Sequence, residues 1–219
     1  MFATNRWGGR DAAPGRQFDC PVPRAKKLVS ETENAAETTT VHGVLDEEEC
    51  KAVIASAEKG GMEFQTSRGP DFGEALRKHQ RAAFDDPSFA EALWNAGLSE
   101  VCAQLAAGRK KPVGLNPNIR IYQYKPGDLF GRHVDGSNVV AQPAGKTEYT
   151  LLIYLSGAAE GLVGGETAFY GQGGRELLRV VPQAGSALLH RHGKHCLLHE
   201  ALPVTAGIKW ILRSDVVFA

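Results

Sequence analysis

Residues 124–135 read YKPGDLFGRHVD and end on a histidine and an aspartate two positions apart, with glycines on both sides of the pair. If residues 130–135 close a strand, the alternation of side chains places His133 and Asp135 on the same face. A neutral imidazole and a carboxylate placed in this way can share one metal ion. A polar strand end would give the same pattern, so the interpretation depends on a further ligand elsewhere in the chain.

The candidates for that ligand lie in the C-terminal part, at His190, His192, His195 and His199. Two histidines and one carboxylate on one face of a metal leave other positions open, as in non-haem Fe(II) sites. His190 and His192 could pair with each other and are rivals, whereas His195 reads as an ordinary solvent-facing or satisfied histidine. His199 has the best context, because the turn residues of segment 203–207 precede a strand that begins near residue 208.

A cation follows on that strand. Lys209, Ile211 and Arg213 alternate onto one face, and a cation that faces a protein interior needs an anion beside it. A small dicarboxylate would be such an anion. The alternative is that Lys209 faces solvent where the strand begins.

The rest of the chain divides into a helical part and a strand-rich part. Residues 38–45 are β-branched and predict a strand. Residues 46–61 predict a helix that Asp46 caps, with acids in its first turn and glycines at its end. A second helix is expected within 85–108. From residue 116 onward, short β-rich segments alternate with turn signals at roughly the 8–12-residue spacing of a sandwich or barrel, so helices should pack outside a β-sandwich.

Composition excludes several classes of function. The chain has 219 residues and a formal net charge of zero, so no global field attracts nucleic acid or an anionic membrane. No stretch approaches the ~20 apolar residues of a membrane span. Four scattered cysteines without a CxxC pair favour a reducing compartment. The cytoplasm is therefore the expected location, with an organelle transit segment left open by the arginines near the start.

Taken together, the segments resemble the 2-oxoglutarate and Fe(II)-dependent dioxygenases, in their prolyl 4-hydroxylase-like branch. The family carries His-x-Asp, a distal histidine and a basic residue ten positions later, and Lys209 follows His199 at that spacing. The resemblance covers about residues 38–219. The matching segments are YKPGDLFGRHVD (124–135), TLLIYLS (150–156), GGETAFY (164–170), GSALLH (185–190) and HEALPVTAGIKWIL (199–212).

The resemblance implies a fold of class α+β, mainly β: a double-stranded β-helix (jelly-roll) core with N-terminal helices packed on one sheet. Residues 1–37 would form a partly irregular extension and residues 38–219 the dioxygenase domain. It also implies Fe(II) and 2-oxoglutarate as cofactors and O2 as cosubstrate, with ascorbate as a candidate supporting reductant. The expected metal ligands, which are also the catalytic residues, are His133, Asp135 and His199.

Lys209 and Tyr124 are expected at the C5 carboxylate of 2-oxoglutarate, and Thr150, Leu152 and Tyr154 are expected to line the same pocket. Tyr122 is expected on the opposite face of its strand. Arg213 lies four positions after Lys209 and could replace or assist it, since a guanidinium binds a carboxylate through two hydrogen bonds. His190 stands where relatives often carry a bulky apolar residue and is expected to line the pocket in this chain.

The resemblance implies a reaction that couples oxidative decarboxylation of 2-oxoglutarate to hydroxylation of a substrate C–H. Hydroxylation is expected rather than halogenation, because halogenating relatives carry a small residue in place of the carboxylate of Asp135. A protein or peptide side chain such as proline is the first substrate class, with segments 66–81 and 135–148 as candidate substrate loops. The alternative substrate is a free amino acid or small metabolite. The alternative functions are a non-catalytic jelly-roll binding protein and a zinc hydrolase built on residues 190–199. Neither nucleic acid nor membrane is an expected partner.

Overall fold

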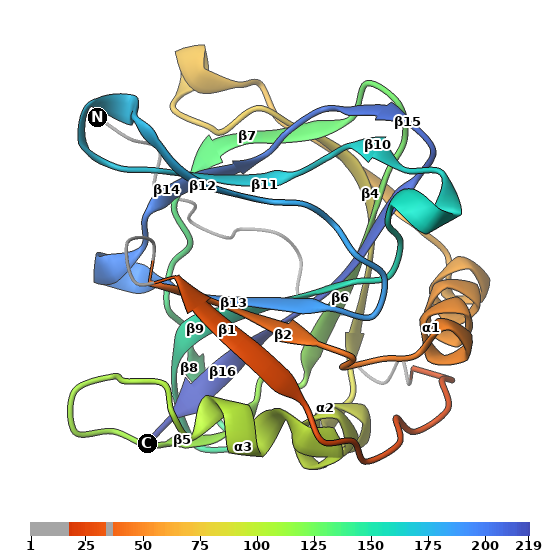
Figure 1. The fold of residues 1–219 in the computed structure, drawn as a ribbon. Coiled ribbons are helices and arrows are strands. Elements are labelled where there is room, and N and C mark those ends of the chain that lie inside the picture. The colour runs from red at the N-terminus through yellow and green to blue at the C-terminus, as the bar shows by residue number, and fades with distance from the viewer. Residues whose placement is uncertain (1–17, 34–36) are drawn as a thin grey trace.

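A computed structural model describes residues 18–33 and 37–219 (Figure 1). Its helices are α1 (Glu47–Gly60), α2 (Pro87–Leu93) and α3 (Ser99–Cys102). Its strands are β1 (Val29–Glu33), β2 (Thr38–His42), β3 (Glu63–Thr66), β4 (Arg77–Asp85), β5 (Pro112–Leu115), β6 (Asn118–Tyr124), β7 (Leu129–His133), β8 (Val139–Val140), β9 (Gly145–Tyr154), β10 (Val163–Gly164), β11 (Thr167–Tyr170), β12 (Glu176–Val180), β13 (Ala187–Arg191), β14 (Leu198–Ala201), β15 (Val204–Ala206) and β16 (Lys209–Phe218).

Helix α1 begins where the sequence predicts. The side chain of Asp46 accepts a hydrogen bond from the backbone N–H of Glu49, and the carboxylate of Glu49 accepts one from the N–H of Asp46. This reciprocal capping satisfies two donors that the first turn of a helix otherwise leaves unpaired. Gly61, with φ of 83°, follows the last turn.

The sequence predicts one continuous helix within residues 85–108, and this prediction is wrong because the helix is interrupted. Helix α2 ends at Leu93, a π-helical turn covers Trp94–Leu98, and α3 is one short turn. The interruption falls at Gly97, whose φ of 126° is not helical and is accessible mainly to glycine. A Cβ at this position would lie 2.5 Å from the carbonyl oxygen of Lys26, so the N-terminal segment packs directly against the break.

The strands form one strongly curled antiparallel sheet, in the order β1-β2-β13-β9-β16-β6-β4-β7-β14-β11-β12. Strands β3, β5 and β8 join it at β4, β16 and β9, and β10 pairs separately with β15. Figure 1 shows β7, β14, β11 and β12 folded over the layer that contains β13, β9, β16 and β6. This arrangement confirms the predicted double-stranded β-helix.

Two apolar cores occupy the two sides of the larger layer. One lies beneath the helices and contains Val53, Leu93, Ile119, Ile121 and Leu212, among others. The second lies inside the curl and contains Tyr122, Tyr124, Phe169 and Ile211. Strands β6 and β16 supply both cores, because alternate side chains point to opposite faces. The candidate site borders the second core.

Two segments of the chain differ from their expected form. Strand β1 lies within the residues assigned to the N-terminal extension, yet it pairs with β2 along its length. Residues 66–81 were expected to be a loop, and this is wrong at the C-terminal end, because β4 begins at Arg77 and pairs with both β6 and β7. The remaining part of the segment connects β3 to β4 as a projecting hairpin.

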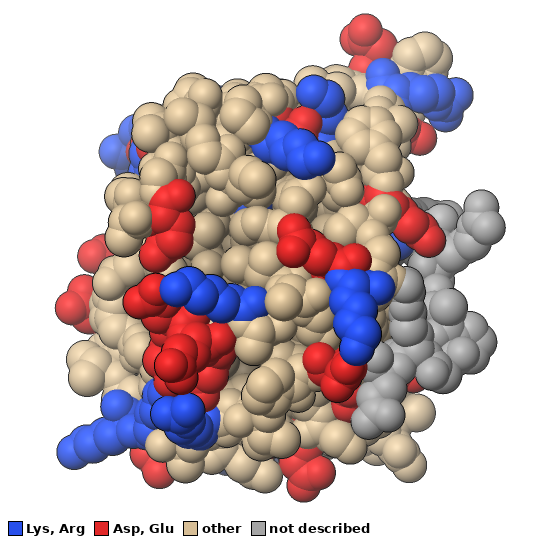
Figure 2. All heavy atoms as spheres, turned by 90° about the vertical axis from the view of Figure 1, so that its right-hand side faces the viewer, with Lys and Arg blue, Asp and Glu red and all other residues tan. Residues whose placement is uncertain are grey.

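Within the described ranges, the structure contains no helix with the length and apolar character needed to cross a membrane. Basic and acidic side chains are interspersed on the face that carries α1 (Figure 2). That face therefore offers no extended surface of one charge sign.

Candidate active site

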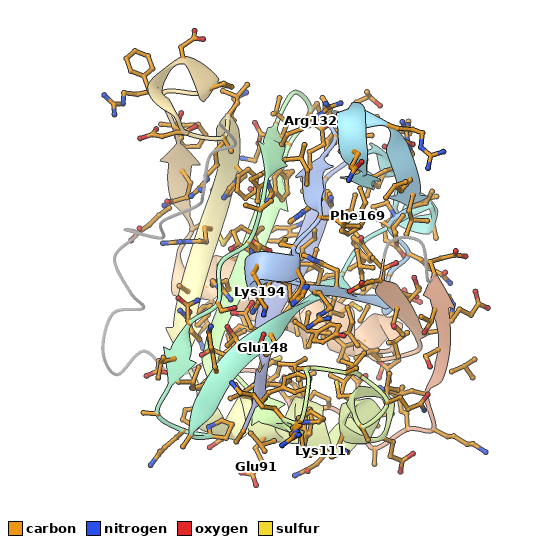
Figure 3. All side chains as sticks on the ribbon, turned by 90° about the vertical axis from the view of Figure 1, so that its left-hand side faces the viewer. Glu91, Lys111, Arg132, Glu148, Phe169 and Lys194 are labelled. Carbon is orange, nitrogen blue, oxygen red and sulfur yellow. The ribbon has the colours of Figure 1, made fainter. Side chains whose placement is uncertain are left out.

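His133, Asp135 and His199 meet at one end of the barrel, inside the curl. His133 ends β7, and its register partner on β14 is His199. One ligand-type atom from each of the three side chains lies within 4.8 Å of the others. The Nε2 atoms of His133 and His199 lie 3.8 and 3.7 Å from the carboxylate oxygens of Asp135. Arg132, Phe169 and Lys194, labelled in Figure 3, come from the strands and the turn that surround this end.

Backbone carbonyls orient both imidazoles. Nδ1 of His133 lies 2.8 Å from the carbonyl oxygen of Gly131, and Nδ1 of His199 lies 2.9 Å from that of Leu197. A carbonyl oxygen can only accept a hydrogen bond, so each Nδ1 carries hydrogen and each Nε2 is the atom available to a metal. Metal-ligating histidines in proteins are commonly held in this way. The donor set of two imidazole nitrogens and a carboxylate therefore fits Fe(II).

Asp135 is held by a basic side chain and a hydroxyl. Arg213 places Nη1 3.1 Å from Oδ1 and Nη2 3.0 Å from Oδ2 of this carboxylate. The hydroxyl of Thr150 donates to Oδ2 at 2.9 Å. Arg213 also lies 3.4 Å from Asp215, which in turn pairs with Arg120 at 2.6 Å. A buried chain of alternating charges thus fixes the orientation of Asp135.

These neighbours shift the pKa values of the group. Burial raises the pKa of Asp135, but the charge of Arg213 and the two histidines together lower it well below its usual range. Burial, aided by His199, lowers the pKa of His133 to about 3. Burial also lowers the pKa of His199, but Asp135 outweighs that effect and raises it to about 10. A metal ion bound by this group would compete with the proton that Asp135 favours on His199.

Lys209 is the buried cation of the pocket. Its side chain is fully buried, and Nζ has no hydrogen-bond partner among the described residues. Nζ lies 5.4 Å from the ring centre of Tyr124 and 5.8 Å from that of Tyr154. An unpaired buried ammonium is costly, so this position is suited to an anion that enters the pocket. The carboxylate of 2-oxoglutarate fits it.

Gly165 makes room for this lysine. Its φ is 71°, and a Cβ built on it would lie 2.9 Å from Cδ of Lys209. Gly164 and Gly165 form the turn before β11, and both residues have positive φ. The second glycine also permits the close approach of the lysine stem.

The other expected pocket residues divide into two groups. Tyr124 and Leu152 line the pocket together with the metal-binding group and Lys209. Thr150 instead lies behind Asp135, and the hydroxyl of Tyr154 hydrogen-bonds to Thr167 at 2.9 Å. Arg213 lines the pocket but is engaged with two carboxylates, which leaves Lys209 as the cation available to a cosubstrate.

The expectation that Tyr122 faces away from the pocket is wrong. Tyr122 lines it beside Tyr124, because residues two apart on a strand share a face. Its hydroxyl is buried and has no hydrogen-bond partner in the described part of the chain. The same alternation from Tyr124 could have revealed it.

The three remaining C-terminal histidines lie in different surroundings. His190 is buried and lines the pocket. His192 is buried between the hydroxyls of Thr150 and Thr147, each 3.0 Å from one of its ring nitrogens. His195 is exposed. The expectation that His190 lines the pocket is confirmed.

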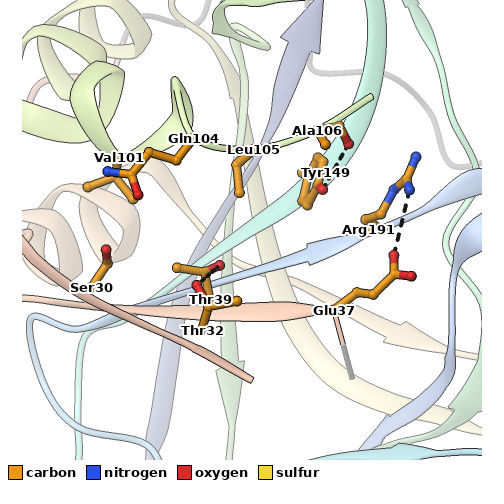
Figure 4. A pocket seen from close by; sticks show the side chains of 10 residues that line it. All are labelled: Ser30, Thr32, Glu37, Thr39, Val101, Gln104, Leu105, Ala106, Tyr149 and Arg191. Atoms are coloured by element: carbon orange, nitrogen blue, oxygen red, sulfur yellow. Dashed lines mark hydrogen bonds and ion pairs between the residues drawn. The ribbon is translucent and has the colours of Figure 1, made fainter. Parts of the chain in front are cut away.

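A larger cavity, of about 380 Å³, lies elsewhere. Its lining includes Arg191, which follows His190 on β13 and therefore points to the opposite face of the strand. Figure 4 shows Arg191 paired with Glu37, at 3.6 Å. The charge of Arg191 is thus paired with that of Glu37, whereas Nζ of Lys209 has no hydrogen-bond partner among the described residues.

Replacing Arg213 by methionine should weaken metal binding about 10–100-fold, the range found when a partner of a metal ligand is removed. Asp135 would lose both guanidinium hydrogen bonds, and its pKa would rise, so protons would compete better with the metal. Calorimetric titration with Co(II) measures the effect. Unchanged affinity would show that Arg213 does not orient the carboxylate.

Comparisons with known proteins agree with this geometry. Residues 119–214 match the family described as the 2OG-Fe(II) oxygenase superfamily. No curated protein matches the chain significantly. The matched residues include His133, Asp135, His199 and Lys209.

Solved structures with the same fold include three prolyl hydroxylases. The viral collagen prolyl hydroxylase of Paramecium bursaria Chlorella virus-1, solved as a 2OG complex, is 21% identical, with a TM-score of 0.55 over 83% of this chain and 96% of that one. A prolyl-4-hydroxylase of Pseudomonas putida is 19% identical, with a TM-score of 0.53 over 82% and 91%. A prolyl hydroxylase of Trichoplax adhaerens, in complex with a hypoxia-inducible factor peptide, is 18% identical, with a TM-score of 0.59 over 84% of each chain.

Proposed function

Because residues 119–214 match the 2OG-Fe(II) oxygenase superfamily, we propose that this chain is such an oxygenase, and we propose which residues hold its cofactors and which substrate class it hydroxylates. His133, Asp135 and His199 hold Fe(II). Lys209, with Tyr124 beside it, binds the far carboxylate of 2-oxoglutarate. The substrate is a protein or peptide side chain such as proline.

One observation carries the assignment of the cosubstrate site. A fully buried ammonium, which has no hydrogen-bond partner in the part of the chain that the structure describes, lines the same pocket as the buried His-Asp-His group. A charge-assisted hydrogen bond to a carboxylate is worth about 1.5–3 kcal/mol, and this pocket offers the cation without a competing protein anion in contact. A jelly-roll protein that binds a ligand only through apolar contacts would not need a buried ammonium at this position.

The bound cofactors supply the oxidising power through decarboxylation of 2-oxoglutarate, and the protein supplies position and shielding. Arg213 and Thr150 keep Asp135 ionised and oriented towards the two imidazoles. Leu152 and Ile211 border the group with apolar surface. Lys209 fixes the end of 2-oxoglutarate that does not react.

The hairpin between β3 and β4 favours a peptide substrate over a free amino acid. Phe64, Phe72 and Leu76 are large apolar side chains that it leaves exposed. Its base reaches the site, because the guanidinium of Arg77 lies 4.7 Å from the ring centre of Phe130, which stacks on His133 at 3.7 Å. Exposed apolar groups that lead to a buried site are suited to an extended ligand. The viral collagen hydroxylase and the complex with a hypoxia-inducible factor peptide support the same class.

Substrate class is tested by coupled turnover. Succinate formation from 2-oxoglutarate is measured with proline-containing peptides and with free proline, and the product is examined for the mass of one added oxygen. We expect stimulation by peptides and a lower kcat/KM for them in Phe72→Ser, with unchanged turnover in the absence of substrate. If free proline or another small metabolite stimulated succinate formation, and Phe72→Ser did not change this stimulation, the assignment of a peptide substrate would be overturned.

The affinity for 2-oxoglutarate should fall as the pH rises above 7. Burial lowers the pKa of Lys209 to about 7, and Glu166 offsets this only in part. Below pH 7 the ammonium is charged and ready for the carboxylate; above it, binding must take up a proton, which weakens affinity by up to about tenfold per pH unit. Calorimetry of the metal-loaded protein between pH 7 and 9 measures this. Lys209→Arg, whose guanidinium stays charged, should lose the dependence, and a flat profile in the wild type would contradict the explanation.

We propose a reducing, cytoplasmic location for the enzyme. All four cysteines lie in the described residues and are unpaired, which agrees with such a compartment.

A further inference from the structure

His190 has the features of a metal ligand that the His-x-Asp…His pattern does not include. It lies near the end of β13, and its side chain is only 2% exposed. Nε2 has no hydrogen-bond partner in the described residues and lies 3.8 Å from Oδ2 of Asp135. Nδ1 lies 3.2 Å from the carbonyl oxygen of Arg191, so Nδ1 carries the hydrogen and Nε2 presents a lone pair to the site.

A lone pair facing a carboxylate is unfavourable unless a cation lies between them. A hydrogen bond between the two atoms would need a proton on Nε2 and a separation near 3 Å. The observed 3.8 Å is too long, and the hydrogen of the neutral ring is committed to the Arg191 carbonyl. A metal ion in the group would satisfy this otherwise orphaned nitrogen.

His190 repeats the arrangement of the two expected histidine ligands. In His133, His190 and His199 alike, Nδ1 lies against a backbone carbonyl, and Nε2 lies 3.7–3.8 Å from a carboxylate oxygen of Asp135. The rings of His190 and His199 meet edge to face, with centres 4.6 Å apart. Three imidazoles therefore converge on one carboxylate.

Cys196 is the other candidate for an extra donor, since it forms a possible metal-binding group with His190 and His199. Its sulfur lies 3.8 Å from Nδ1 of His199, the nitrogen whose hydrogen goes to the Leu197 carbonyl. The sulfur also accepts a hydrogen bond from the backbone N–H of Asp135 at 3.2 Å. The thiol thus faces the wrong side of His199 to share its metal.

We propose that His190 is a fourth protein ligand of the metal in the absence of cosubstrate, and that 2-oxoglutarate displaces it. The proposal rests on the metal site of the proposed function. Four protein ligands on a six-coordinate ion would leave two positions, whereas 2-oxoglutarate bound through two oxygens and dioxygen together need three. His190 therefore has to leave the metal before dioxygen can bind beside 2-oxoglutarate.

His190 also lies where an entering cosubstrate would meet it. It lines the same pocket as His133, Asp135, His199 and Lys209. A ligand that reaches from Lys209 to the His-Asp-His group would therefore pass beside His190.

Proton NMR of the Co(II)-loaded wild-type protein tests the proposal. Each coordinated imidazole gives a paramagnetically shifted, exchangeable N–H resonance from its Nδ1. We expect three such resonances without 2-oxoglutarate and two when it is saturating. Two resonances in the free state, or three that persist with saturating 2-oxoglutarate, would overturn the proposal and leave the proposed function intact.

Variants give a second readout. His190→Phe should weaken Co(II) binding at least ~10-fold without 2-oxoglutarate, give two resonances, and bind 2-oxoglutarate more tightly because nothing has to be displaced. The matched Cys196→Ser should keep three resonances. Weaker Co(II) binding in Cys196→Ser, with unchanged binding and unchanged resonances in His190→Phe, would assign the extra donor to sulfur and overturn the proposal. If the wild type bound no Co(II), or His199→Ala bound it equally well, the proposed metal site itself would fail.

Discussion

Replacing His199 by alanine should reduce metal affinity by more than ~100-fold and abolish succinate formation. Loss of a partner that only orients a ligand costs about 10–100-fold, and here an entire ligand is removed from the group. Asp135 would keep Arg213 and Thr150 as partners, so the carboxylate would stay in place while the site lost one of its imidazoles. Calorimetric titration with Co(II) and a succinate assay with Fe(II) measure the two effects.

The matched control is His195→Ala, four positions earlier in the chain. His195 is exposed and lies in the short turn Gly193–His195, so its loss should change neither metal affinity nor turnover. If His195→Ala or His192→Ala, rather than His199→Ala, removed metal binding, the ligand set would be different. A zinc site within residues 190–199 would then be the better account.

Replacing Lys209 by methionine should weaken 2-oxoglutarate binding about 10–100-fold while leaving metal binding in place. The estimate follows from a charge-assisted hydrogen bond of about 1.5–3 kcal/mol, at about 1.4 kcal/mol for each factor of ten. Methionine keeps an unbranched apolar side chain in the space of the lysine stem. Calorimetry of 2-oxoglutarate binding to the metal-loaded variant measures the loss.

The same variant should be more stable than the wild type in the absence of ligands. The buried ammonium has no hydrogen-bond partner among the described residues, and removal of such a group relieves its desolvation cost. A higher midpoint of thermal unfolding together with weaker 2-oxoglutarate binding would identify Lys209 as a residue kept for function. Lys194→Met, on the exposed turn, is the control. Undiminished 2-oxoglutarate binding in Lys209→Met would point to a different clamp.

Alternation along strands made the site partly predictable from sequence. It put Lys209, Ile211 and Arg213 on one face, and all three line the pocket. The same alternation places Tyr122 beside Tyr124 in the pocket, although Tyr122 was expected on the opposite face. Capping chemistry likewise predicted where α1 begins, since the first turn is local in sequence.

Features that depend on distant partners were not predictable in the same way. Arg213 was given as a residue that could replace or assist Lys209 at the cosubstrate, and it pairs instead with Asp135, which the curled sheet brings close to β16. The break at Gly97 reflects the close approach of Lys26, far away in the chain. The position of His190 follows from the pairing of β13 with β9, where it lies opposite Thr150. Each of these requires the topology of the sheet.

The central claim is most directly tested by a crystal structure with Mn(II) and 2-oxoglutarate bound in the absence of dioxygen. The account predicts anomalous density for the metal between His133, Asp135 and His199, and the far carboxylate of 2-oxoglutarate against Nζ of Lys209. A metal bound elsewhere, or a far carboxylate held by a different cation, would contradict it.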